Sequence, residues 1–87
     1  MIQIIYHSNF LKSAKRLSEK IRDKLAKNII LLEKNPFDSR LHTKHLSGEL
    51  AGLLSFRITR AWRVIFQFID VKTIQFLRVA NRKDIYK

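Results

Sequence analysis

The side chains best suited to chemistry in this sequence are arginines in its second half. Arg57 and Arg63 flank the short basic segment 59–61, and Arg82 follows near the carboxyl end. A guanidinium group stays charged at any working pH, and its planar fork donates paired hydrogen bonds that match phosphate oxygens. Arginines brought together from different strands would therefore form a phosphate-binding site.

The charge of the whole chain favours the same kind of partner. The 87 residues contain 18 Lys and Arg against 7 Asp and Glu, a net charge of +11. Such an excess attracts polyanions, largely through the release of their counterions. We expect a nucleic acid as partner, with an acidic protein as the second possibility.

Several classes of protein are disfavoured by composition. The absence of cysteine excludes disulfides, thiolate metal ligands and cysteine nucleophiles. The three histidines have no spacing typical of metal ligands, so neither a metal nor a cofactor is expected. No apolar run approaches the roughly 20 residues that span a bilayer, and the start does not read as a signal peptide. We expect one cytoplasmic domain over residues 1–87, without a membrane partner.

The first part of the chain predicts a strand over residues 2–6 and then two helices. Ser8 or Asn9 offers an N-cap for the first helix, and Ser18 offers one for the second, after a break near residues 17–19. Asn35-Pro36 ends the helical region, because proline disfavours helical geometry at the residue before it. One apolar stripe runs through both helices: Phe10, Ala14, Leu17, Ile21, Leu25, Ile29 and Leu32.

Residues 36–50 read as an irregular segment that leads into a hairpin. Gly48 and Gly52 bracket the entry to the hairpin and are expected to permit turn or bulge geometry. Polar function is more common on such a segment than on a solvated helix face. Its candidate side chains are Arg40, His42, Lys44, His45 and Glu49.

Residues 53–70 predict a hairpin whose register follows from its pattern. One strand alternates Leu54, Phe56 and Ile58 with polar residues, and the next alternates Trp62, Val64, Phe66 and Phe68. Joining the two apolar faces through a three-residue loop at 59–61 sets Arg57 opposite Arg63. Two like charges facing each other across a sheet are unfavourable by a few tenths to about 1 kcal/mol. An anion bound between them would explain the arrangement.

The next turn, at Val71-Lys72, predicts that Asp70 pairs with Thr73. This register places Leu77 and Val79 on the core face, near Phe66 and Val64 respectively.

The same register sends Arg78 and, if the strand persists, Arg82 to the face that carries Arg57 and Arg63, because burying an unpaired Arg78 would be unfavourable. The fold class is α+β. An N-terminal strand and two helices pack on one face of an antiparallel sheet completed by a three-strand meander, and guanidinium groups line the other face.

This order of elements, with the stretch LSGELAGLLSFRITRAWRVIFQF and the ending RVANRKDIYK, resembles the RelE/ParE superfamily of toxins from type II toxin-antitoxin systems. The resemblance covers nearly the whole chain and implies a RelE-like fold. Members of the RelE and YoeB branches cut messenger RNA, usually in the ribosomal A site, and a partner antitoxin silences them.

The resemblance also implies roles for individual residues. Arg63 matches the arginine that holds the scissile phosphate, and Arg57 matches a basic residue that contacts phosphate and in some members assists proton transfer. Arg82 matches an arginine assigned to the leaving group or transition state, and Tyr86 matches a tyrosine that stacks on or orients a base. Further RNA contacts are expected from Lys44, Arg60, Arg78 and Lys83.

The sequence departs from the pattern at the general base. The RelE branch has lysines where this chain has Ser55 and Arg57, and the YoeB branch has a loop glutamate near the position of Lys44. His45 is the base that we select from the local candidates, because an imidazole titrates near neutrality. The other two candidates are His42 and Glu49.

The sequence therefore predicts a ribosome-dependent mRNA endoribonuclease toxin that cuts without a metal, by attack of the 2′-hydroxyl, and so inhibits translation. Its partners would be mRNA, the ribosome and an acidic, helical antitoxin in a hetero-oligomer. Two alternatives stay open. One is a ParE-like inhibitor of DNA gyrase that cuts nothing, and the other is a non-catalytic basic module that binds RNA or the ribosome.

Overall fold

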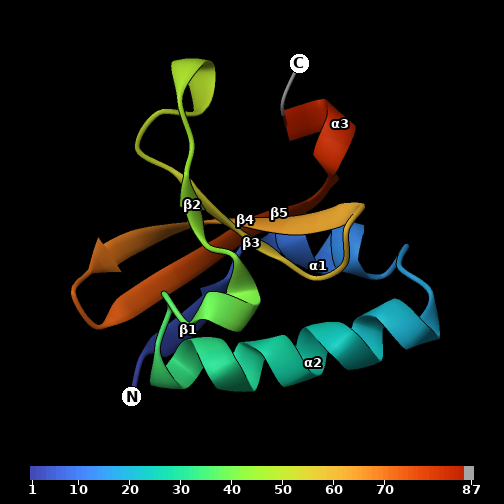
Figure 1. The fold of residues 1–87 in the computed structure, drawn as a ribbon, viewed down its shortest axis with the longest axis horizontal. Coiled ribbons are helices and arrows are strands. Elements are labelled where there is room, and N and C mark those ends of the chain that lie inside the picture. Colours follow the sequence, from blue (N-terminus) through green and yellow to red (C-terminus); the bar gives the residue numbers. More distant parts are fainter. Residues whose placement is uncertain (86–87) are drawn as a thin grey trace.

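Five strands form one mixed sheet in the order β1-β5-β4-β3-β2 in the computed structural model, which describes residues 1–85. Figure 1 shows α1 and α2 on one side of this sheet, and η2 and α3 on the other. The elements are β1 (Gln3–Tyr6), α1 (Ser8–Ala14), α2 (Glu19–Lys34), η1 (Ser39–Leu41), β2 (Lys44–His45), η2 (Gly48–Leu50), β3 (Leu54–Arg57), β4 (Trp62–Asp70), β5 (Thr73–Asn81) and α3 (Arg82–Ile85).

Two apolar clusters pack on opposite faces of the sheet. The larger one joins the helices to strands β3, β4 and β5, and its fully buried members include Leu32, Phe56, Phe66 and Phe76. The smaller one, around Ile65, lies under η2 and α3 and includes the partly buried Leu77 and Ile85. Among residues 1–85, each helix is too short or too polar to span a lipid bilayer.

The two predicted helices and the break between them are confirmed. Ser18 caps α2 as expected, its Oγ accepting the N–H of Ile21 at 3.4 Å. The predicted cap of α1 is wrong, because Ser8 and Asn9 already lie inside the helix. His7 caps it instead, with Nδ1 accepting the Asn9 N–H at 3.0 Å.

The α+β class is confirmed, but the sheet is not purely antiparallel. Strand β1 pairs in parallel with β5, while the other neighbours are antiparallel. A parallel neighbour needs a long connection, and here residues 7–72 supply it, with α1, α2 and strands β2, β3 and β4. Residues 36–50, expected to be irregular, contain η1, β2 and η2. The glycine prediction is confirmed, since Gly48 and Gly52 have φ of 63° and 92°.

The predicted register is confirmed at both turns and fails between them. Arg57 pairs with Arg63, and Asp70 pairs with Thr73. Two register shifts, between Phe68 and Asp70 and between Ile65 and Phe66, interrupt the β4–β5 ladder. They turn Phe76 rather than Leu77 toward Phe66, while Val79 still faces Val64 and Arg78 faces Ile65. Leu77 therefore belongs to the smaller cluster, because each bulge inserts one extra residue on a strand.

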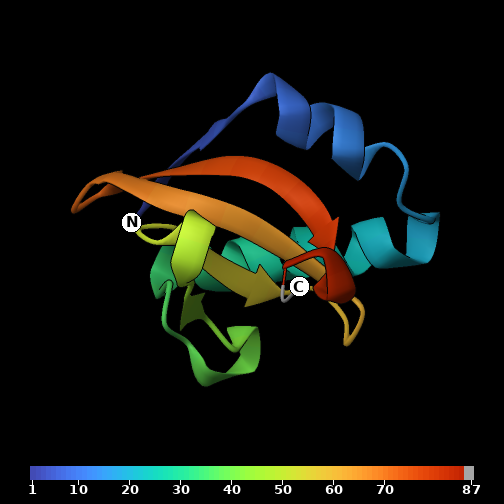
Figure 2. The ribbon, with the colours of Figure 1, turned by 90° about the horizontal axis from the view of Figure 1, so that it is seen from above.

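Side chains from both helices complete the sheet where its short edge strands end. Beyond β1, the Ser13 hydroxyl of α1 accepts the Val79 N–H of β5 at 2.9 Å. Beyond β2, the Asn28 amide of α2 donates to the Arg57 carbonyl of β3 at 2.9 Å. Figure 2 shows α1 running beside β5, on the same edge of the sheet as β1. Backbone groups that lack a strand neighbour are thus paired by helix side chains.

Replacing Ser13 by Ala is expected to lower the free energy of unfolding by about 1–2 kcal/mol. The change leaves the buried Val79 N–H without its acceptor, and that loss exceeds the gain in helix propensity from alanine. Urea unfolding of the two proteins measures the difference. An unchanged urea midpoint would mean that the hydrogen bond between Ser13 of α1 and Val79 of β5 does not stabilise the fold.

Asp38 and Arg40 form an ion pair at η1, with Arg40 Nη2 2.9 Å from Asp38 Oδ2. Two hydrogen bonds from Arg40 lower the pKa of Asp38 from 3.8 to about 2. The bond from the Arg40 side chain has the larger effect, and the bond from its backbone N–H has the smaller one. A lowered carboxyl pKa stabilises the fold above pH 3.8, and this stabilisation is lost as the pH falls through about 2. We expect the difference in stability between wild type and Asp38→Asn to shrink over that range in acid titrations. A difference independent of pH would contradict the ionic origin.

Candidate functional site

Arg57 and Arg63 face each other at the end of the β3–β4 hairpin. The Ile58 N–H donates to the Trp62 carbonyl at 2.9 Å, so residues 58 and 62 form a hydrogen-bonded pair of the ladder. Antiparallel pairs alternate, and Arg57 with Arg63 is therefore a non-hydrogen-bonded pair, whose Cα atoms are about 4.5 Å apart. This is the closer type of pair, so the two cations start from neighbouring backbone positions.

The two arginines lie in a depression of about 490 Å³, which we call the basic depression. Among residues 1–85, every residue that lines it is a cation: Lys44, Arg57, Arg60, Arg63 and Arg82. They come from β2, β3, the β3–β4 turn, β4 and α3. The strand pairing explains how Lys44 joins them, because Lys44 is opposite Ser55, which shares its face with Arg57.

Burial and hydrogen bonding make the basic depression suited to binding an anion. Arg63 is only 6% exposed, and its Nη1 donates to the Thr59 carbonyl at 2.8 Å. Arg57 Nε is buried without a hydrogen-bond partner among residues 1–85. None of Arg57, Arg60 and Arg82 forms an ion pair with a described carboxylate. A phosphate oxygen would satisfy the buried donor and reduce the repulsion between the cations.

The β3–β4 turn positions the other arginines. The Thr59 hydroxyl accepts the N–H groups of Ala61 and Trp62 at 3.3 and 3.2 Å, which tightens the turn that carries Arg60. The Arg82 N–H then donates to the Ala61 carbonyl at 2.7 Å. This bond fixes the start of α3 beside the turn. Arg82 therefore reaches the depression although β5 has already ended at Asn81.

Replacing Arg57 by Met is expected to stabilise the free protein by roughly 0.2–1 kcal/mol, because it removes a like charge directly opposite Arg63. The unpartnered Nε is removed as well. Urea unfolding in a buffer without phosphate or sulfate measures the change. A clear loss of stability would show that Arg57 makes favourable contacts in the free protein.

The other predicted RNA contacts lie in two neighbouring depressions. Lys83 lines one of about 620 Å³, which shares Arg60 and Arg82 with the basic depression. Arg78 lines another of about 800 Å³ between η2 and α3, together with Glu49 and Asp84. The predicted site residue Tyr86 lies outside the described residues.

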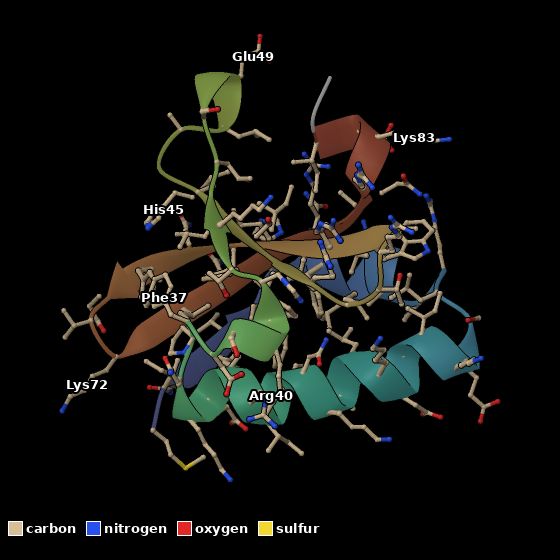
Figure 3. All side chains as sticks on the ribbon, viewed as in Figure 1. Phe37, Arg40, His45, Glu49, Lys72 and Lys83 are labelled. Atoms are coloured by element: carbon tan, nitrogen blue, oxygen red, sulfur yellow. The ribbon has the colours of Figure 1, made fainter. Side chains whose placement is uncertain are left out.

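The loop candidates for the general base lie elsewhere. His45 pairs with Leu54, which faces the helices, so β2 directs His45 away from the face that carries Arg57. Its ring stacks on Phe37 at a centroid distance of 6.2 Å, on the side of the molecule opposite Lys83 (Figure 3). Glu49 projects from η2 away from the sheet (Figure 3). Neither these residues nor His42 line the basic depression.

Asn28 contacts Arg57 and was not predicted from the sequence as a residue of the site. It lies on the buried side of α2 between Leu25 and Leu32 and is 8% exposed. A polar residue three positions after one buried leucine and four before the next was the available signal. No group of three or more potential metal ligands comes together among residues 1–85.

A sequence model described as the ParE toxin of the type II toxin-antitoxin system, parDE, matches residues 4–86. The chain belongs to the ParE toxin family. The match covers nearly the whole chain, including the hairpin with Arg57 and Arg63, and confirms the RelE/ParE resemblance. A search of curated protein sequences found no significant match.

Solved structures show that this ParE-family fold is shared by several toxins. YafQ from E. coli strain BL21(DE3) is 20% identical with a TM-score of 0.78, and each chain covers 100% of the other. The YoeB/ParE toxin from Agrobacterium tumefaciens is 16% identical with a TM-score of 0.77, over 93% of this chain and 99% of that one. The toxin-antitoxin complex RelBE2 from Mycobacterium tuberculosis is 24% identical with a TM-score of 0.76, over 93% of this chain and 98% of that one.

Proposed function

We propose that this chain is a toxin that cleaves messenger RNA on the ribosome and so inhibits translation. The observation that carries the proposal is the basic depression, in which Arg57 and Arg63 face each other with Arg82 beside them. A cluster of cations that includes a buried, unpartnered donor is suited to a phosphate group. Fold similarity to YafQ, YoeB/ParE and RelBE2 is consistent with this class of toxin.

The reaction that suits such a depression needs no metal. The 2′-hydroxyl oxygen of the RNA attacks the adjacent phosphorus and loses its proton to a base. The bond from phosphorus to the 5′-oxygen breaks, and that oxygen takes up a proton. Cations that contact the phosphate stabilise the extra negative charge of the transition state. The products are a 2′,3′-cyclic phosphate and a 5′-hydroxyl, and DNA is resistant because it lacks the nucleophile.

Each arginine has a separate part in this proposal. Arg57 and Arg63 hold the non-bridging oxygens of the scissile phosphate, and Arg82 stabilises the leaving 5′-oxygen. Arg60 and Lys44 hold the flanking backbone. The described lining residues are all cationic, and we assign them binding and charge stabilisation rather than removal of the 2′-proton.

We further propose that an acidic antitoxin binds this cationic surface in the cytoplasm and forms a hetero-oligomer with the toxin. The net charge of +11 supports an acidic partner. The similar RelBE2 structure is itself a toxin-antitoxin complex.

Sequencing the 5′ ends of cellular transcripts after brief expression tests the proposal. We expect new 5′ ends within translated frames, and fewer of them when translation initiation is blocked. An in vitro translation reaction with a message that carries one 2′-deoxy nucleotide at the cut position should lose cleavage there. Intact transcripts in both assays would overturn the proposal.

Inhibition of DNA gyrase is the second candidate function, and the ParE description of the matching family favours it. Supercoiling assays with purified gyrase and induction of the DNA-damage response test this alternative. Gyrase inhibition with intact message would assign the basic depression to protein or DNA binding. Binding of RNA without cleavage or gyrase inhibition would instead identify a non-catalytic RNA-binding module.

A further inference from the structure

We propose that Asn28 is a positioning residue that holds Arg57 opposite Arg63 before any anion binds. Its Nδ2 donates to the Arg57 carbonyl oxygen at 2.9 Å, across 29 residues of sequence. The link to RNA cleavage rests on the proposed function. The link to anion binding rests only on the geometry of the basic depression.

Asn28 is a buried polar residue at a position of α2 that faces the core. Asn28 is 8% exposed and occupies a position of α2 whose buried neighbours are Leu25 and Leu32. A buried amide is unfavourable unless it is hydrogen-bonded, and asparagine is also a weaker helix former than leucine. An apolar side chain here would serve the core, so packing alone does not explain this residue.

The pattern of the sheet explains why Arg57 needs this donor. In a non-hydrogen-bonded pair, the backbone N–H and C=O point away from the facing strand. The Arg57 carbonyl therefore points away from β4, toward the side on which β2 lies. The pairing of β2 with β3 begins at Lys44 and Ser55, so no strand lies beside Arg57. Asn28 supplies the hydrogen bond that a longer β2 would have supplied.

The hydrogen bond from Asn28 lies where the pairing of β3 with β4 is least favourable. Arg57 is the last residue of β3, immediately before the turn, and a like charge faces it on β4. Repulsion between the guanidinium groups favours separation of the strand ends. The amide of Asn28 fixes the carbonyl of the same residue to a helix that packs in the larger core cluster. Arg57 is thus held near its binding geometry, and less ordering remains for the anion to impose.

The test compares Asn28→Leu and Asn28→Asp with Ser13→Ala, using inorganic phosphate as the probe. Asp keeps the shape of Asn and lacks the donor while it is ionised, whereas Leu removes the donor without adding a charge and fits the apolar stripe of α2. Ser13→Ala is the matched control, because it also removes a bond between a helix and the sheet at an edge, but at Val79 of β5. Phosphate affinity is measured from thermal stabilisation as a function of phosphate concentration. The ¹⁵N–¹H signal of Arg57 Nε reports binding at the site itself.

We expect both Asn28 variants to bind phosphate about fivefold more weakly, which corresponds to ~1 kcal/mol, or one net hydrogen bond. The Arg57 Nε signal should broaden in the free variants, and Ser13→Ala should bind phosphate as the wild type does. Asn28 variants that lose stability but keep wild-type phosphate affinity and a sharp Arg57 signal would overturn the inference. If Asn28→Leu does not fold, the width of the Arg57 Nε signal in Asn28→Asp decides the question, because the added charge alters phosphate affinity by itself.

Cleavage assays separate this inference from the proposed function. In an active toxin, the Asn28 variants should lose kcat, while Ser13→Ala keeps it. If the wild-type protein binds phosphate but cuts no RNA, the proposed function fails, and the phosphate affinities of the variants still test the role of Asn28. If the wild type does not bind phosphate, the inference about Asn28 fails as well.

Discussion

Replacing Arg63 by Met is expected to slow RNA cleavage by about 10²–10³-fold, the usual effect of removing one preorganised donor from a developing oxyanion. Arg63 is the most buried cation of the basic depression, where surrounding protein strengthens its field at a bound phosphate. The single-turnover rate on a ribosome-bound message measures the effect. Circular dichroism verifies folding, because Arg63 also donates to the Thr59 carbonyl.

Two controls separate the shape of the guanidinium from its charge. Arg63→Lys keeps the charge but loses the planar fork, and an intermediate rate is expected. Lys24→Met removes one charge from the exposed side of α2 and should leave the rate near that of the wild type. An Arg63→Met protein with wild-type activity would exclude Arg63 from the chemistry.

Replacing Phe66 by Ala is expected to lower the free energy of unfolding by about 3–5 kcal/mol, a large part of the ~5–15 kcal/mol that stabilises a typical domain. Phe66 is fully buried on β4, and its ring contacts Phe56 and Phe76 at centroid distances of 5.9 and 6.5 Å. Truncation removes this packing and leaves a cavity in the larger core cluster. Urea unfolding measures the loss.

Phe37→Ala is the matched control for the loss of an aromatic ring. Phe37 is 54% exposed and stacks on Phe68 from the surface, at a centroid distance of 6.2 Å. We expect its replacement to change stability by less than about 1 kcal/mol. Similar losses for Phe66→Ala and Phe37→Ala would mean that burial does not determine the contribution of these rings.

The part of the fold that sequence could predict is the part governed by local pattern. Alternation of apolar residues on β3 and β4 permits one pairing that buries Phe56 with Val64, and this pairing also sets Arg57 opposite Arg63. The break at Ser18 was predictable because a cap is read from a single residue and its neighbours.

Features that depend on distant segments were beyond such a reading. The parallel pairing of β1 with β5 joins segments some 70 residues apart, and no short pattern encodes it. The bulges in the β4–β5 ladder shifted Leu77 to the other face, because alternation predicts a regular ladder only. The predicted caps of α1 failed for a local reason, since the imidazole of His7, just before the predicted cap, accepts the Asn9 N–H.

The candidate site was also predicted only in part. Arg57 and Arg63 followed from one hairpin, whereas Lys44 joins them only because β2 pairs with β3. That pairing also turns His45 to the opposite face, and two adjacent residues of an unrecognised strand could not be assigned to faces in advance.

The way in which the sheet ends bears on how this protein behaves at high concentration. Its outer strands, β1 and β2, are four and two residues long. Beyond them, Ser13 and Asn28 already occupy backbone groups of β5 and β3. A long row of free N–H and C=O groups is the template on which copies of a protein add strand to strand and aggregate. Neither edge offers such a row. The isolated toxin should therefore resist fibril formation, although the small size of the domain limits its stability.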